Sequence, residues 1–140
     1  MKYLLDTCFL SELVKPAPEQ SVLSWMGERI ESELFVSAMT IAEIGRGIKR
    51  LPASRRQDEL STWLQQLKVG FDKRMLAFTV ESADAWAHMC ANMEAKGKPM
   101  AAFDSIIAAT ALQHSLALVT RNVRDFAHAP LVLINPWPAD

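Results

Sequence analysis

The stretch KYLLDTCFLSELV at positions 2–14 predicts how the fold begins. Residues 2–5 form a short apolar run that ends at Asp6, which is typical of a buried strand. Residues 7–14 then have the pattern of a short helix, and the prolines that follow stop it because proline lacks a backbone N–H. The chain is therefore expected to open with a strand and a helix that have a carboxylate at their junction.

The same alternation continues along the chain. Short apolar runs predict further strands at residues 34–37, 76–79, 116–120 and 131–134. Apolar residues spaced three and four apart predict helices at residues 21–30, 41–48, 54–68, 83–97 and 103–114. Because strands that alternate with helices pair in parallel, we expect an α/β fold with three layers (α/β/α) and a central parallel sheet of four to five strands. No linker interrupts the sequence, which predicts a single domain over residues 1–140.

Composition excludes several classes of protein. Of the 140 residues, 50% are hydrophobic and 22% are charged, which excludes a disordered chain. No apolar run approaches the ~18 residues of a membrane span, and Asp6 falls where a signal peptide would still be apolar. Cys8 and Cys90 lie far apart in apolar surroundings, which argues against a disulfide framework. We therefore expect a cytoplasmic protein without a membrane segment.

Basic residues gather in one part of a chain whose formal net charge is only −1. Positions 46 to 74 hold only three acidic side chains but eight basic ones, which are Arg46, Lys49, Arg50, Arg55, Arg56, Lys68, Lys73 and Arg74. A local basic surface can lie along the phosphates of a nucleic acid, and Arg46, Lys49 and Arg50 are the candidate substrate-binding residues. The alternative is an ordinary solvated helix face.

Most acidic residues lie in polar helical segments, but four do not. Asp6 and Asp125 follow expected strands, Glu43 lies about two helical turns after the second strand, and Asp104 opens a helix. In an open parallel sheet, ligands bind beyond the carboxyl ends of the strands. We therefore expect these four carboxylates to meet at one rim of the sheet.

Such a gathering of carboxylates would need protons or cations to be stable. Two carboxylates 4 Å apart repel by ~4 kcal/mol at an effective dielectric constant of 20. Oxygen ligands without a paired histidine or cysteine favour Mg²⁺ or Mn²⁺ over zinc. One or two such ions lower the pKa of a bound water and neutralise a phosphate beside it, which predicts a site for phosphodiester hydrolysis.

Each acid also has a simpler interpretation. Asp104 could cap its helix, and Asp125 could be a turn residue. Glu43 could pair with Lys2 or Arg46. The aspartate at the end of the first strand is the hardest to explain in this way, because an ionised group beside a buried strand costs free energy unless it has a partner.

Several ordered segments carry a resemblance to a known family. They are Leu4–Thr7 with Leu10–Leu13, then Ser37–Glu43, Phe103–Ala111, Leu118–Phe126 and the tail Ile134–Trp137. In this order they resemble the PIN-domain nucleases and, within them, the VapC/FitB-like toxins of bacterial toxin–antitoxin systems. The resemblance covers nearly the whole chain.

The resemblance implies a Mg²⁺-dependent endoribonuclease, with Mn²⁺ as a substitute ion. By matching position, Asp6, Glu43, Asp104 and Asp125 would be the catalytic and metal-binding acids. Thr7 and Thr120 would be minor polar members of the same pocket. The family usually has asparagine two residues after the first aspartate, where this chain has Cys8. That change affects a polar contact that orients the loop at the first acid.

The resemblance also implies a homodimer and a partner antitoxin that wraps the toxin and blocks its pocket. The leading hypothesis is therefore a metal-dependent ribonuclease toxin in which water is the nucleophile. Cys8 leaves open a second hypothesis, a catalytically weak module that binds RNA or an antitoxin. A third hypothesis, a phosphatase, is disfavoured because no second aspartate follows Asp6 two residues later.

Overall fold

A five-stranded parallel sheet forms the centre of the computed structural model, which describes residues 1–139. Its strands, in sheet order, are β3 (Met75–Leu76), β2 (Leu34–Ser37), β1 (Tyr3–Leu5), β4 (Ala117–Val119) and β5 (Leu133–Ile134). The chain starts at the central strand, extends the sheet to one side and then returns to extend it on the other. In open parallel sheets, ligands bind beyond the carboxyl ends of the strands at such a reversal, which here lies at β1 and β4.

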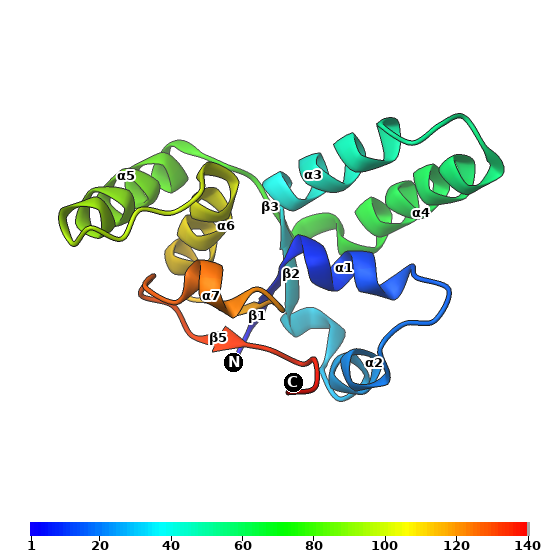
Figure 1. The fold of residues 1–140 in the computed structure, drawn as a ribbon, viewed down its shortest axis with the longest axis horizontal. Helices are drawn as coiled ribbons and strands as arrows, with labels where there is room; N and C mark the ends of the chain where they lie inside the picture. Colours follow the sequence, from blue (N-terminus) through cyan, green and yellow to red (C-terminus); the bar gives the residue numbers. More distant parts are fainter. Residues whose placement is uncertain (140) are drawn as a thin grey trace.

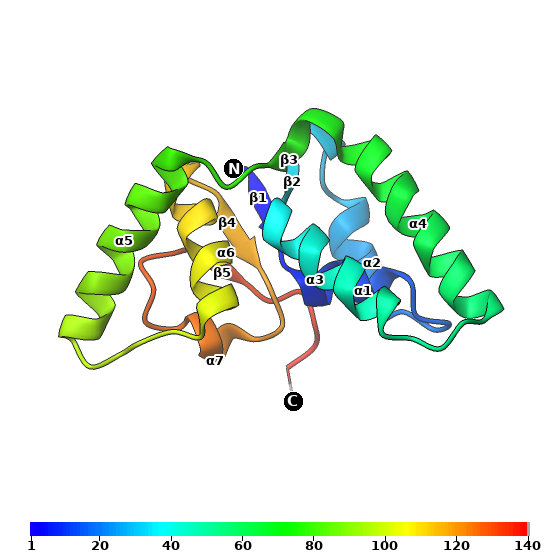
Figure 2. The same cartoon turned by 90° about the horizontal axis from the view of Figure 1, so that it is seen from above.

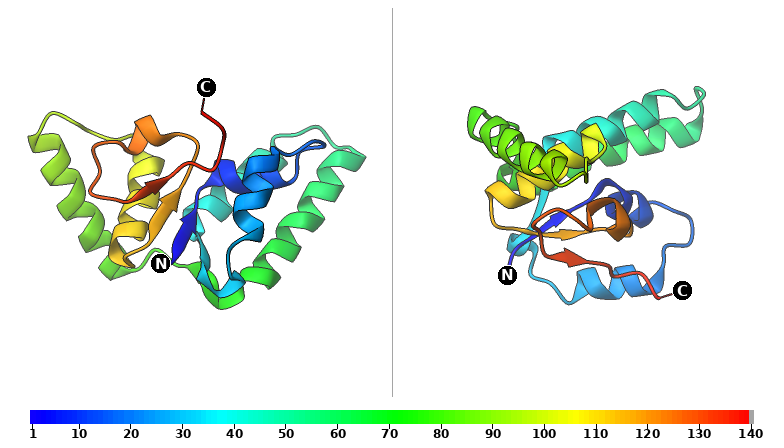
Figure 3. Two further views of the ribbon diagram at one scale, coloured as in Figure 1. Left: turned by 90° about the horizontal axis from the view of Figure 1, so that it is seen from below. Right: turned by 60° about the vertical axis from the view of Figure 1, so that its left-hand side comes forward.

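Helices cover both faces of the sheet. They are α1 (Thr7–Leu13), α2 (Gln20–Gly27), α3 (Ala38–Lys49), α4 (Arg55–Phe71), α5 (Val80–Ala95), α6 (Ala102–Gln113) and α7 (Val123–Phe126) (Figure 1). The α3–α4 pair and the α5–α6 pair spread apart from each other, and α3 and α6 are the inner helices of the two pairs (Figure 2). In side view, α3 to α6 lie on one side of the strands and α2 lies on the other (Figure 3).

Alternation of side chains along the central strands divides the core in two. Leu4 and Leu118 pack with residues of α5 and α6, such as Met89 and Ile107. The next residues along the same strands, Leu5 and Val119, belong to a second cluster with Phe9, Val22 and Trp137. Since residues of both faces are buried, the expected three-layer α/β fold with a parallel sheet is confirmed.

Most of the expected elements are present within one to three residues of their predicted ends. Ser54 caps α4 as expected, since its hydroxyl accepts a hydrogen bond of 3.1 Å from the Gln57 amide. Gly97, with φ of +70°, ends α5 as expected. The strand expected at 76–79 is shorter, because Thr79 instead caps α5 by accepting a hydrogen bond from the Ser82 amide.

Two further sequence predictions concern the whole chain. All five strands join one sheet, but the prediction of one domain over residues 1–140 stays a prediction. Among residues 1–139, none of the helices combines the length and apolar composition needed to cross a membrane.

Glu12 is a buried carboxylate that ties α1 to two distant parts of the chain. It is 5% exposed and accepts hydrogen bonds from Lys15 Nζ (3.0 Å), the Glu19 amide (3.1 Å) and Trp137 Nε1 (3.2 Å). The contact with Lys15, followed by the bonds from Glu19 and Trp137, holds the pKa of Glu12 below its usual range. Glu12 therefore fastens the carboxyl-terminal segment and the start of α2 to α1.

We expect Glu12→Ala to lower the free energy of unfolding by about 1–3 kcal/mol, because it leaves the Trp137 and Glu19 donors without their acceptor. Urea unfolding measures this change. The control is Glu59→Ala, which removes an exposed ion pair with Arg55 and should cost no more than about 0.5 kcal/mol. Equal losses in the two variants would show that Glu12 does not fasten the fold.

Candidate functional site

Asp6 lies at the carboxyl end of β1 and is fixed there by donors from two elements. Its backbone amide donates to the Val119 carbonyl of β4 at 3.0 Å, which continues the sheet by one residue. Its Oδ2 accepts a hydrogen bond of 2.8 Å from Thr120 Oγ1, and its Oδ1 accepts one of 2.8 Å from the Thr7 amide. The Asp6 side chain is 5% exposed, and these hydrogen bonds hold it in one orientation at the start of α1.

Glu43 is joined to this position through Thr7. The Thr7 hydroxyl donates to Glu43 Oε1 at 2.8 Å and lies 3.2 Å from the hydroxyl of Thr40. The Thr40 amide in turn donates to Ser37, which caps α3 at the end of β2. The two threonines therefore set the position of Glu43 relative to the first strand.

The simpler interpretation of Glu43 as half of an ion pair is wrong for the conformation described. Within residues 1–139, Glu43 makes no ion pair. The Lys2 ammonium lies over the Phe35 ring at 5.8 Å, and the Arg46 guanidinium lies over the Phe103 ring at 5.5 Å. Both cations have aromatic partners in place of the carboxylate.

Asp104 lies in the first turn of α6, and the other three acids affect its pKa. Ala101 is the N-cap residue of this helix, so Asp104 is not the cap. Burial, followed by the charges of Asp6, Asp125 and Glu43 in that order, raises the pKa of Asp104 to about 6. The other three acids thus lie near enough to act electrostatically on Asp104, while their meeting in one metal-binding site stays a prediction. We call Asp6, Glu43, Asp104 and Asp125 the acidic pocket.

Asp125 belongs to the short helix α7 and not to an irregular turn. Its amide donates to the Asn122 carbonyl at 3.0 Å, and the Asn122 amide donates to Thr120 Oγ1 at 3.0 Å. Thr120 therefore contacts both Asp6 and the segment that leads to Asp125. Asp125 is exposed and lines a cavity of about 240 Å³ together with Asp104.

Cys8 makes a polar contact with Asp6 from the position at which the family usually has asparagine. Its Sγ lies 3.6 Å from Asp6 Oδ2, to which it donates, and 3.5 Å from Thr120 Oγ1. Burial, and then the charge of Asp6, raise the pKa of the Cys8 thiol. The side chain consequently stays a neutral, weak donor beside the first acid.

Of the basic candidates, only Arg46 adjoins the acidic pocket. It lies on α3 beyond Glu43 and stacks on Phe103, the residue before Asp104. Lys49 and Arg50 are exposed farther along the same helix, and their substrate-binding role stays a prediction.

Two other residues of the basic segment have structural partners. Arg74 donates to the Glu31 and Leu34 carbonyls, both at 2.7 Å, and Arg56 donates to the Val14 carbonyl at 2.7 Å. These guanidinium groups hold backbone segments together. The basic segment between positions 46 and 74 therefore does not act as one continuous surface.

The carboxylate oxygens of the acidic pocket are ligands that a hard cation prefers, but the side chains are too widely spaced to enclose an ion. In the part of the chain that the structure describes, no three acidic, histidine or cysteine side chains are close enough to surround one ion. Mg²⁺ usually keeps several water ligands and is held by one or two carboxylates. The pocket thus fits a hydrated ion between carboxylates better than a closed protein cage.

Comparison with known proteins finds close relatives over nearly the full length. VapC ribonuclease Y4jK of Sinorhizobium fredii is 33% identical over 135 residues, covering 96% of this chain and 96% of that protein. Toxin FitB of Neisseria gonorrhoeae is 36% identical over 135 residues, covering 96% of this chain and 97% of that protein. The crystal structure of FitAcB from Neisseria gonorrhoeae matches with a TM-score of 0.92 and 35% identity, over 98% of this chain and 99% of that one.

A family model described as the PIN domain matches residues 3–131, which include all four acids of the acidic pocket. The parallel sheet, the placement of those acids and the full-length relatives agree with this match. The chain belongs to the PIN-domain family.

Proposed function

We propose that this protein is a metal-dependent endoribonuclease and the toxin of a toxin–antitoxin pair. The observation that carries the proposal is the acidic pocket, in which the charges of Asp6, Asp125 and Glu43 all raise the pKa of Asp104. A ribonuclease and a toxin are among the full-length relatives, which supports RNA as the substrate. We extend to this chain the antitoxin partner, the homodimer and the cytoplasmic location expected from its sequence.

Asp6, Glu43 and Asp104 would hold the ion, and Asp125 would complete the site or support a second ion. When bound, Mg²⁺ or Mn²⁺ supplies positive charge to the phosphodiester and acidifies a bound water. The protein keeps the carboxylates oriented before the substrate arrives: Thr120 and the Thr7 amide fix Asp6. This arrangement lowers the cost of reorganising the site during the reaction.

The threonines act as positioning residues. Thr7 donates its single hydroxyl proton to Glu43, so one oxygen of that carboxylate is occupied and the other remains available. Thr120 similarly occupies one oxygen of Asp6. These carboxylates would be available to accept a proton from a water that attacks the phosphorus.

One observation favours the alternative of a catalytically weak binding module. The thiol of Cys8 contacts Asp6 at 3.6 Å, and a thiol is a weaker donor than an amide N–H. Asp6 nevertheless retains two donors at 2.8 Å, so its orientation does not depend on Cys8. Cleavage assays with Mn²⁺ separate the two functions, since a binding module would retain RNA without cutting it.

We expect Asp104→Asn to reduce kcat/KM for RNA cleavage by about 10²–10⁴-fold, because it removes a charged oxygen from the acidic pocket. The assay is cleavage of a panel of structured RNAs with Mg²⁺ or Mn²⁺. Asp84→Asn, which removes an exposed carboxylate on α5, is the matched control and should cleave at the wild-type rate. Wild-type activity in Asp104→Asn would contradict the site assignment, and release of phosphate from a phosphomonoester would favour the phosphatase hypothesis.

We expect millimolar Mg²⁺ or Mn²⁺ to raise the melting temperature, because an ion bound only to the folded protein stabilises it by RT ln(1 + [ion]/Kd). Thermal unfolding is compared with NaCl of equal ionic strength, which screens the acids without coordinating them. The increase should shrink in Asp104→Asn and persist in Asp84→Asn. An identical response to NaCl and Mg²⁺ would count against a specific cation site.

The raised pKa of Asp104 predicts a pH dependence of stability in metal-free protein. Between about pH 4 and pH 6 the folded protein keeps a proton that the unfolded chain has released, so the wild type loses stability as the pH rises. Asp104→Asn lacks this loss. Urea unfolding in EDTA should therefore show the variant gaining on the wild type from pH 4 to pH 7. A difference that stays constant with pH would mean that Asp104 does not titrate as described.

A further inference from the structure

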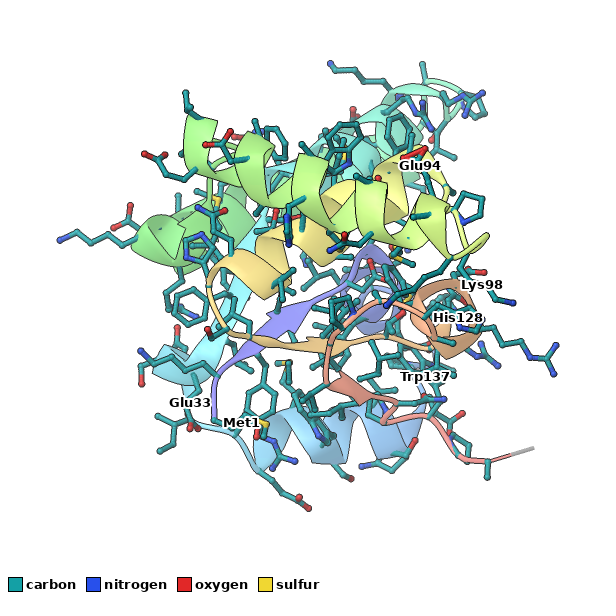
Figure 4. All side chains as sticks on the ribbon, turned by 90° about the vertical axis from the view of Figure 1, so that its left-hand side faces the viewer. Met1, Glu33, Glu94, Lys98, His128 and Trp137 are labelled. Atoms are coloured by element: carbon teal, nitrogen blue, oxygen red, sulfur yellow. The ribbon has the colours of Figure 1, made fainter. Side chains whose placement is uncertain are left out.

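A cavity of about 240 Å³ adjoins the acidic pocket on the side of α6 and α7. Asp104 and Asp125 belong to both. Lys98, from the loop between α5 and α6, also lines this cavity, as do Arg124 of α7 and His128 just after α7. Figure 4 shows Lys98 and His128 side by side at the same end of the molecule, although they come from separate segments. We call this space the side cavity.

The basic side chains of the side cavity have no side-chain hydrogen bond or ion pair to any of the residues that the structure describes. Within residues 1–139, Lys98, Arg124 and His128 form no ion pair, although two carboxylates line the same space. Arg74 and Arg56, in contrast, donate to backbone carbonyls at 2.7 Å. The donors of the side cavity are thus available to an external acceptor.

The chemistry of the side cavity suits an anion with several oxygen acceptors. Guanidinium groups match phosphate geometry through paired donors, and an ammonium group supports them as a point charge. The cavity is smaller than the ~300–1,000 Å³ of pockets that enclose a whole drug-sized ligand. It therefore has room for a phosphate group.

We propose that Lys98, Arg124 and His128 form a subsite for the phosphate that neighbours the scissile phosphodiester in an RNA strand. This inference rests on the proposed function. An RNA strand whose scissile phosphate lies at Asp104 and Asp125 must continue past them, and the side cavity is directly adjacent. The subsite would neutralise a phosphate that the acidic pocket would otherwise repel.

The subsite has a consequence for substrate length. A substrate with a single phosphodiester cannot fill the acidic pocket and the side cavity together. An oligonucleotide can fill both, so it gains binding energy that the short substrate lacks. The enzyme is therefore expected to select for a phosphate chain as well as for the bond that it cuts.

The test compares a short RNA oligonucleotide with bis(p-nitrophenyl) phosphate, which has one phosphodiester. Lys98→Gln and Arg124→Gln should each raise KM for the oligonucleotide about 10-fold, since each removes one charge-assisted contact. The loss in kcat/KM should be about 10-fold larger for the oligonucleotide than for the small diester. Lys96→Gln is the matched control, because Lys96 is exposed two residues away and does not line the cavity.

Equal losses on both substrates, or no loss on either, would overturn the subsite. Failure of the wild type to cleave either substrate would instead refute the proposed function, so binding is measured separately. Anisotropy of a labelled single-stranded RNA in EDTA gives the dependence of affinity on salt. Lys98→Gln should reduce the slope of log K against log salt by about 0.7, the value for one phosphate contact in a single strand. An unchanged slope would overturn the subsite even without catalysis.

Discussion

The hydrogen bond between Thr120 and Asp6 joins β1 and β4 at their carboxyl ends. Strands are added to one side of the sheet before this point and to the other side after it. β1 and β4 are neighbours, and their last residues lead into this bond of 2.8 Å. The strands are only three residues long, so their register fixes the position of the carboxylate directly. Thr7 then extends the same network to Glu43 on α3. This junction therefore positions Asp6 and, through Thr7, Glu43.

The acidic pocket sets function against stability. Its carboxylates lie near enough for three of them to raise the pKa of Asp104, and within the described residues 1–139 no basic side chain pairs with Glu43 or Asp104. Such a cluster destabilises the metal-free fold, and a bound cation would remove that cost. Elsewhere the same chain satisfies a buried carboxylate fully, since Glu12 has three donors. Among residues 1–139, no hydrogen bond of this kind satisfies the Asp104 carboxylate, which agrees with the proposed cation site.

Sequence periodicity predicted the strand at residues 34–37 and the capped helix at Ser54, because both signals are local. Because parallel strands end at one edge, the sequence also placed Asp6, Glu43 and Asp125 near enough to Asp104 to raise its pKa. It did not predict α7, which is too short to show a helical period. Nor did it separate Arg46 from Arg74, because their partners, a phenyl ring and backbone carbonyls, are set by tertiary packing.

The same limit explains why the side cavity was not foreseen. Lys98 and His128 lie in irregular segments thirty positions apart, where neither spacing nor hydropathy shows which way the chain folds. The net charge of −1 is equally uninformative about nucleic-acid binding, since it sums charges that the fold separates. Asp104 and Asp125 line the side cavity together with Lys98 and Arg124, which form no ion pair within residues 1–139. An anionic strand can thus be held at the border while a cation balances the acids at the centre, so a chain without a net positive charge can still bind RNA.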